Sequence, residues 1–247
     1  MLADILKNEL PNGRFWTHAW SIIDGCTPIS PGCQNCWLAG IATRFKWEGL
    51  VTDGHFDGRV VQRPDRVLSG VPGGRPKVFA VWSDFFHEKV TDTFRNVAFN
   101  EIARHPEHYF LIITKRPEVA VKWCQGFGAL KNVLIMVTME NQEMAWKRVP
   151  AAAQLAAMGW TMGALIEPML GPVVFDRFIP GKGAPKLLFQ WVICGQENGK
   201  GKRAFDPSWA MDVRDQCAQA GIPFLYKADG GHLGGPFSPV CHGVPDL

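Results

Sequence analysis

From Lys77 onward, short apolar runs alternate with longer segments of helical pattern. The runs are rich in β-branched and aromatic residues and end in polar residues, which is typical of buried strands. They cover residues 78–82, 109–114, 133–138, 164–166, 191–194 and 223–226. The segments that predict helices are 91–104, 117–125, 142–158 and 207–220. Strand followed by helix, repeated about six times, predicts parallel strands joined by right-handed crossovers.

The first part of the chain adds one more strand, at 20–23, and a helix at 36–45. The pattern fits a (β/α) barrel or an open doubly wound sheet, and the chain length suits a barrel formed as one unit. We therefore expect an α/β fold, a partial or complete TIM-like barrel of about six to seven parallel strands, in a single domain spanning 1–247. Within this domain, we expect a loop insertion at residues 48–76, an irregular crossover at residues 168–188 and a C-terminal tail at residues 228–247.

Two of the predicted helices carry start signals. Thr91 is suited to cap the helix that follows it, and Asp206 precedes a proline at the first helical position.

Composition indicates a globular protein outside the membrane. Apolar residues make up 47% and charged residues 20% of 247 residues, and no apolar run approaches the roughly 18 residues of a membrane span. The first ten residues already contain Asp4, Lys7 and Glu9, unlike a signal peptide. We expect a cytoplasmic protein with no membrane partner. A net charge of +3 permits nucleic-acid binding without demanding it.

Three of the seven cysteines lie within eleven residues of one another, as Cys26, Cys33 and Cys36. The loop that holds them is rich in Gly, Pro and Ser. Three thiolates this close would repel one another unless a soft metal centre neutralised them. The other four cysteines are scattered, and an odd total does not suggest a disulfide framework. The loop therefore predicts a metal or cluster site.

The cysteine loop admits three interpretations. One is a structural zinc site completed by a histidine, although no second ligand pair is spaced for it; the histidines considered are His18, His55 and His87. Another is a redox pair of Cys33 and Cys36, which leaves Cys26 without a role. The third is a 4Fe–4S cluster, in which three cysteines leave one iron open to an exogenous ligand.

Polar side chains follow each predicted strand, where parallel strands place active sites on one face. These groups are Ser83-Asp84 with His87, Thr114-Lys115-Arg116, Thr138 to Asn141, Glu167-Pro168, Gly195 to Asn198, and Lys227. A single Ser or Thr at a strand end needs no functional explanation, because polar residues end strands in any α/β protein. Charges that converge on a concave face must be paired or bind ligand, so function is favoured for Glu140, Glu167, Glu197, Lys115 and Lys227.

Basic residues offer a candidate phosphate site. The Gly-rich loop after the sixth run carries Lys200, Lys202 and Arg203, and backbone N–H groups beside such cations bind phosphate well. The insertion contributes further cations, namely Arg59, Arg63, Arg66, Arg75 and Lys77. Ten tryptophans could stack on bases. The alternative is that these are solvated loops and core aromatics.

Seven segments in order resemble the bacteriophage three-Cys-motif family of the radical S-adenosylmethionine (SAM) superfamily. They are GCTPISPGCQNCW, WSDFFHE, LIITKRPE, VTMENQ, IEPMLGP, WVICGQENGKGKRAFDP and GIPFLYK, and they span nearly the whole chain. The chain departs from most of the superfamily in two ways. It has six residues, rather than three, between the first two cysteines, and it has an asparagine, Asn35, directly before the last cysteine.

The resemblance implies a fold and two cofactors. The fold is a radical SAM (β/α) barrel. A 4Fe–4S cluster would be held by Cys26, Cys33 and Cys36, with SAM on its open iron. Ser83 and Asp84 would hold the amino group of SAM, Glu140 or Asn141 its ribose, and Glu167 would lie near the adenine or the substrate. Thr114, Lys115 and Thr138 are expected to complete the cofactor site.

The resemblance also implies a reaction. Members occur in thymidine hypermodification in phage, so we expect radical isomerisation that moves an aminoacyl group on the thymine 5-methylene from nitrogen to carbon attachment. The substrate would be DNA, with its base flipped or single-stranded, or a nucleotide; an electron donor such as flavodoxin would act in the host cytoplasm. Candidate catalytic residues are Glu167, Glu197 and Lys227. The alternatives are a DNA lesion-repair lyase with the same cluster and a zinc-stabilised, non-catalytic nucleic-acid-binding protein.

Overall fold

The computed structural model describes residues 2–45, 47, 49–175, 188–198, 201–227, 240–241 and 243–245. Its centre is a sheet whose strands are ordered β1-β6-β7-β8-β9-β10-β11-β12. The first seven pair in parallel and β12 is antiparallel at the edge. The strands are β1 (His18–Trp20), β6 (Val78–Val81), β7 (Tyr109–Thr114), β8 (Val133–Thr138), β9 (Thr161–Ile166), β10 (Trp191–Gly195), β11 (Phe224–Lys227) and β12 (Val240–Cys241).

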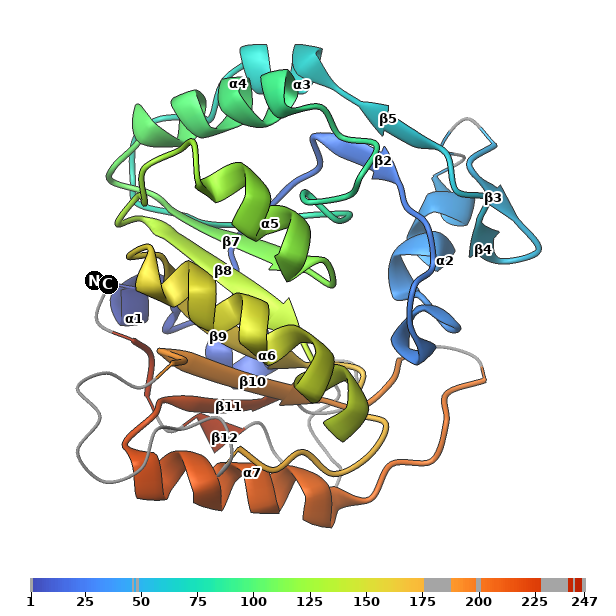
Figure 1. Cartoon of the computed structure of the whole chain (residues 1–247), viewed down its shortest axis with the longest axis vertical. Coiled ribbons are helices and arrows are strands. Elements are labelled where there is room, and N and C mark those ends of the chain that lie inside the picture. Colours follow the sequence, from blue (N-terminus) through green and yellow to red (C-terminus); the bar gives the residue numbers. More distant parts are fainter. Residues whose placement is uncertain are drawn as a thin grey trace.

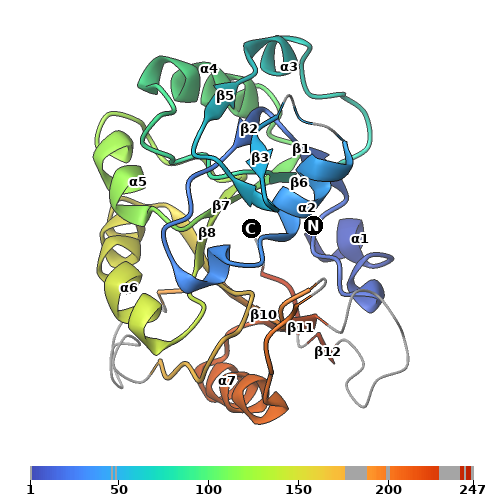
Figure 2. The same cartoon turned by 90° about the vertical axis from the view of Figure 1, so that its right-hand side faces the viewer.

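The parallel strands form a half-barrel, with helices on its outer side (Figure 1). Figure 2 shows these helices in an arc around the strands, while the segment around α2 lies in front of the C-terminal ends of the strands. The arc is made by α4 (Asp92–Ala103), α5 (Pro117–Cys124), α6 (Gln142–Ala157) and α7 (Pro207–Ala220). The predicted α/β class and partial barrel are confirmed, and β1 and β12 lie at the two edges of the sheet within the described residues.

Both faces of the sheet are buried, which explains why the strands read as continuous apolar runs. On β8, Val133, Ile135 and Val137 pack in the larger core with the outer helices. The alternate residues Leu134 and Met136 pack in a second core on the inner face. Leu2 and Leu6 of α1 (Leu2–Leu6) belong to that second core. The short N-terminal helix therefore packs against the inner face of the half-barrel.

The predicted helix starts are confirmed. Thr91 Oγ1 accepts a hydrogen bond from the Phe94 N–H at 3.2 Å, and an Asp206 carboxylate oxygen accepts one from Ser208 N at 2.9 Å. Each side chain satisfies a backbone donor that has no partner within the helix. The predicted helix at 36–45 is α2 (Trp37–Arg44).

The predicted loop insertion at 48–76 was wrong in part, because the segment contains regular structure. It holds β3 (Val51–Thr52), β4 (His55–Phe56), β5 (Val60–Gln62) and α3 (Pro64–Leu68). β5 pairs antiparallel with β2 (Ile23–Gly25), so the predicted strand at 20–23 is divided between β1 and β2. Elements of two to five residues are too short to produce a readable period.

Two arginines of this segment serve the fold. The Asp24 carboxylate, 1% exposed, accepts hydrogen bonds from Arg63 Nε at 2.6 Å and Arg66 Nη1 at 2.8 Å. A buried carboxylate needs such partners. Arg63 and Arg66 therefore hold the segment against β2 through a shared carboxylate.

The other predicted segments are only partly described. Residues 168–175 of the expected irregular crossover contain no helix, and β12 lies within the expected C-terminal tail. In the described residues, the helices are all too short or too polar to cross a bilayer.

Candidate functional site

A cavity of ≈ 400 Å³ lies at the C-terminal ends of the parallel strands, and the cysteine loop forms part of its wall. The three clustered cysteines line it together with most of the predicted strand-end residues, which are Ser83, Asp84, Thr114, Lys115, Thr138, Glu167, Glu197 and Lys227. A volume of this size is typical of a small-molecule site. The predicted residues outside the lining are Glu140, Asn141, Lys202 and Arg203, and Lys200 lies outside the described residues.

The three cysteines are free and half-buried. Among the described residues, the three cysteine sulfurs do not all lie within 4.8 Å of one another. Tetrahedral zinc with Zn–S bonds of about 2.3 Å would hold sulfurs roughly 3.8 Å apart. At least one pair of these sulfurs is therefore farther apart than in a formed zinc site.

Burial keeps the Cys26 thiol protonated. Desolvation, with a contribution from Asp84, raises its pKa to about 12, although the neighbouring Arg116 guanidinium opposes this. A thiol becomes a metal ligand only as the thiolate. To act as a metal ligand, Cys26 would have to lose this proton to the metal centre.

Glu140 anchors the middle of the cysteine loop. Its side chain is fully buried and accepts a hydrogen bond from Arg148 Nη1 at 2.5 Å and a short one from Ser30 Oγ. Burial would raise the Glu140 pKa, but two nearby cations and the Ser30 hydroxyl hold it below its usual value. Glu140 thus stays ionised and fixes the loop, whereas the sequence suggested a ribose contact.

Gly32 lies against Glu140, and we expect its replacement to displace the loop. A Cβ at Gly32 would overlap Cγ and Oε1 of Glu140, and overpacking of this kind costs about 1–3 kcal/mol. Gly32→Ala should therefore lower the urea midpoint of unfolding. The matched control is Gly40→Ala in α2, where a Cβ meets nothing within 4 Å and alanine favours the helix. Equal behaviour of the two variants would contradict the anchoring role.

Asp84 and Arg116 anchor the start of the loop. Arg116 donates from Nη1 to Asp84 Oδ2 at 2.9 Å and from Nη2 to the Thr27 carbonyl oxygen at 2.9 Å. The same Nη1 lies 3.9 Å from Cys26 Sγ. Asp84 also accepts hydrogen bonds from Thr114 Oγ1 at 2.7 Å, and from the N–H groups of residues 86 and 115. Four donors fill the acceptor positions of this carboxylate, so Asp84 organises the loops and presents no free acceptor for an ammonium group.

Glu197 anchors the end of the loop. Its Oε2 accepts hydrogen bonds from Asn35 Nδ2 and Arg203 Nε, each at 2.9 Å, and Arg203 Nη2 donates to Oε1. Burial opposes ionisation of Glu197, but the hydrogen bonds from Arg203 and Asn35 hold its pKa below the usual value. Glu197 and Arg203, considered from sequence as a catalytic group and a phosphate ligand, are paired with each other.

The histidines suggested as zinc ligands are placed elsewhere or already bonded. His87 reaches the cysteine loop, where its Nε2 lies 2.9 Å from Thr27 Oγ1, while its Nδ1 accepts a hydrogen bond from Lys89 N at 3.0 Å. His18 and His55 are outside the cavity lining. Neither nitrogen of His87 is left for a metal without loss of a hydrogen bond.

Two hydroxyls point to a ligand in the cavity. The buried Oγ of Ser83 and Oγ1 of Thr138 have no hydrogen-bond partner among the described residues. Buried polar atoms are rarely left unpaired, and Ser83 also adopts a left-handed backbone conformation, with φ 63°, that is uncommon outside glycine and asparagine. Lys115 lines the same cavity. By contrast, the Asn141 side chain caps α6, accepting from Met144 N at 3.0 Å.

Several residues that shape this site carry little signal in the sequence. Arg116 lies in a polar strand end with nothing to indicate its partners, and Asn35 is distinguished only by its position before Cys36. The aromatic wall of the cavity was also missed, since ten tryptophans offered no signal of which ones converge; it contains Phe15, Trp16, Trp37, Phe56 and Trp82.

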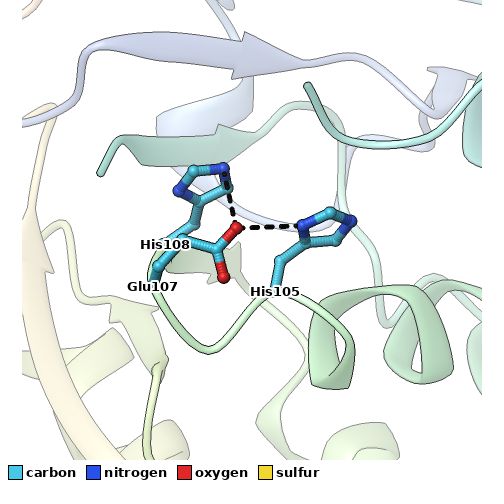
Figure 3. Close-up of side chains that lie close together, drawn as sticks. All are labelled: His105, Glu107 and His108. Carbon is cyan, nitrogen blue, oxygen red and sulfur yellow. Dashed lines mark hydrogen bonds and ion pairs between the residues drawn. The ribbon is translucent and has the colours of Figure 1, made fainter. Parts of the chain in front are cut away.

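A separate cluster of His105, Glu107 and His108 lies before β7, at the opposite end of the strands from the cavity (Figure 3). The Glu107 carboxylate faces both imidazoles, at 3.2 Å from His105 Nδ1 and 3.6 Å from His108 Nε2. However, His108 Nδ1 accepts from Lys77 N at 3.3 Å and Nε2 lies 3.0 Å from the Pro72 carbonyl oxygen. An imidazole that accepts at one nitrogen carries its proton on the other, so His108 ties two loops together and is unsuited to bind metal.

Comparison with known proteins gives one match. The family described as "Protein of unknown function (DUF5131)" matches residues 13–238. No curated protein matches the chain, and neither does any solved structure. The matched range includes the cysteine loop and every strand end that lines the cavity.

Proposed function

The chain belongs to the DUF5131 family, and we propose that it is a radical SAM enzyme whose 4Fe–4S cluster is held by Cys26, Cys33 and Cys36. The observation that carries this proposal is the position of three free cysteines on the wall of a cavity at the strand ends. Three thiolates on a four-iron cluster leave one iron open to another ligand.

SAM would lie in the cavity beside the cysteine loop. The chain offers a cation, Lys115, for its carboxylate, and the unpartnered hydroxyls of Ser83 and Thr138 for its amino group and ribose. When bound, the cluster and SAM supply a 5'-deoxyadenosyl radical that abstracts a hydrogen atom from the substrate. The protein contributes positioning and exclusion of water. Apolar residues such as Phe15, Ile113 and Leu165 line the cavity and serve the second task.

The proposed reaction is isomerisation of an aminoacyl adduct on a thymine base in phage DNA hypermodification. Support comes from the aromatic wall of the cavity, because indole rings stack on bases of any sequence, and from the ordered motifs along the chain. The electron would come from a small donor protein such as flavodoxin. A repair lyase would use the same cluster and differs in its product.

The proposal is tested on protein purified and reconstituted with iron and sulfide under anaerobic conditions. We expect about four iron atoms and four sulfides per chain, and 5'-deoxyadenosine when reduced protein meets SAM and DNA that carries the aminoacyl adduct. Mass spectrometry of the digested DNA separates an isomer of unchanged mass from a cleaved base. Colourless protein with stoichiometric zinc, or reduced cluster protein that forms no deoxyadenosine, would overturn the proposal.

A further inference from the structure

An ion pair borders the cavity without taking part in anchoring the cysteine loop. Lys227 Nζ donates to Glu167 Oε1 at 2.7 Å and to Oε2 at 2.8 Å. The side chains are 22% and 12% exposed, and both residues line the cavity. Glu140 and Glu197 hold loop residues, whereas Glu167 has Lys227 as its one hydrogen-bond donor among the residues described.

The pair spans three adjacent strands because the middle position is a glycine. Gly195 on β10 is the partner of Lys227 on β11, and the preceding Cys194 is the partner of Ile166 on β9. Glu167 and Lys227 therefore flank Gly195. A Cβ at Gly195 would lie 3.2 Å from Glu167 Cδ and 3.3 Å from its Cγ. The absence of a side chain at this position is what lets the two charges meet above the strand.

Each partner of the ion pair has unused hydrogen-bonding capacity. An ammonium has three donors and a carboxylate about four acceptor positions, and the pair uses two of each. Separating a partly buried ion pair is costly. A ligand therefore gains most if it leaves the pair intact and offers one N–H to Glu167 and one adjacent carbonyl oxygen to Lys227.

The neighbouring walls favour a flat ligand. Trp16 and Trp82 line the same cavity, with ring centroids 6.0 Å apart at 86°, and Trp37 meets Trp82 at 5.3 Å. Lys227 Nζ lies 5.1 Å from the Phe15 ring centroid. Aromatic walls beside one donor–acceptor edge form the environment that a planar heterocycle requires, with stacking for its face and hydrogen bonds for its edge.

We propose that Glu167 and Lys227 determine substrate specificity by binding the edge of a planar ring that carries an N–H beside a carbonyl group. The imide edge of a pyrimidine-2,4-dione has this chemistry. The inference rests on the proposed function, in which the modified base is thymine, and it assigns the residues that bind that base. It requires neither cluster nor SAM, so it can be tested separately.

The test is binding of thymidine to the full chain without reconstitution, measured by isothermal titration calorimetry. The probes are thymidine, 3-methylthymidine, which lacks the N–H, and glycine, which carries separate charges. We expect 3-methylthymidine to bind at least tenfold more weakly than thymidine, and glycine to show no binding. Glu167→Gln and Gly195→Ala should each weaken thymidine binding at least tenfold, with the methyl analogue unaffected. Matched controls are Glu118→Gln on α5 and Gly128→Ala, where a Cβ meets nothing within 4 Å.

The Gly195→Ala variant guards against misinterpretation, because it keeps both charges and only shifts Glu167. If Glu167→Gln fails to fold, a Glu167→Gln/Lys227→Met double variant replaces it, because this variant leaves no unpaired charge. The proposal would be overturned if thymidine did not bind, or if it bound no more tightly than its methyl analogue. It would also be overturned if glycine bound more tightly than thymidine, or if the folded variants bound thymidine as the native chain does. Loss of deoxyadenosine formation in a chain that still binds thymidine would instead count against the radical mechanism.

Discussion

Replacement of Glu140 by alanine is expected to destabilise the protein by about 3–5 kcal/mol, because removal of one partner leaves a buried charge unpaired. That charge is Arg148, whose side chain is 6% exposed and donates from Nη1 to Glu140 at 2.5 Å. The cysteine loop loses its contact with Ser30 in the same step. Urea unfolding followed by circular dichroism measures the change.

The helix that holds Arg148, α6, contains a matched control for this experiment. Glu143 pairs with Lys147 at 2.6 Å, but the two side chains are 62% and 63% exposed. Exposed pairs of this spacing contribute about 0.3–0.5 kcal/mol, so Glu143→Ala should shift the midpoint only slightly. A Glu140→Gln/Arg148→Met variant, which leaves no lone charge, should recover most of the lost stability. Similar losses for Glu140→Ala and Glu143→Ala would show that Glu140 is not an anchor.

Replacement of Cys33 by alanine is expected to abolish formation of deoxyadenosine. With two protein thiolates in place of three, the loop loses a ligand that no other described residue of the cavity wall can replace as a thiolate. Iron content after anaerobic reconstitution should fall to a minor fraction of the native value, and the cluster absorbance should be lost. Circular dichroism should remain native, since Cys33 is half-buried and outside the hydrophobic cores.

A second cysteine provides the control for this variant. Cys217 is buried in α7, away from the cavity, and burial raises its pKa to about 12. Cys217→Ala should retain iron, absorbance and deoxyadenosine formation, with a modest loss of stability from the small cavity it creates. If Cys33→Ala retained a full complement of iron and sulfide, the assignment of the cluster ligands would be wrong.

The cysteine loop illustrates how the proposed function depends on anchoring. The contacts that hold it from the strand ends include those from Arg116 to Thr27, from Glu140 to Ser30 and from Glu197 to Asn35. They come from the ends of β7, β8 and β10. We infer that the cysteines are held near their final positions before any metal binds, which lowers the entropic cost of binding.

The sequence alone determined the frame of this protein. Local periodicity located the parallel strands of the half-barrel and their four covering helices, because strands buried on both faces are continuous apolar runs. Parallel pairing then placed all strand ends at one edge, so the clustering of Ser83, Lys115, Thr138, Glu167 and Lys227 around a cavity followed from topology. The close spacing of the three cysteines marked the loop that shares this cavity.

Only the tertiary structure decided what each strand-end residue does. From sequence, Glu140, Glu167 and Glu197 are equivalent carboxylates after strands, yet Glu140 and Glu197 anchor the cysteine loop, whereas Glu167 pairs with Lys227. The contacts that separate them join residues 110 and 162 positions apart, Ser30 with Glu140 and Asn35 with Glu197. No local pattern encodes such distant pairs. They are set by which side chains the fold brings within hydrogen-bonding distance, and by the glycines, at 32 and 195, that leave room for them.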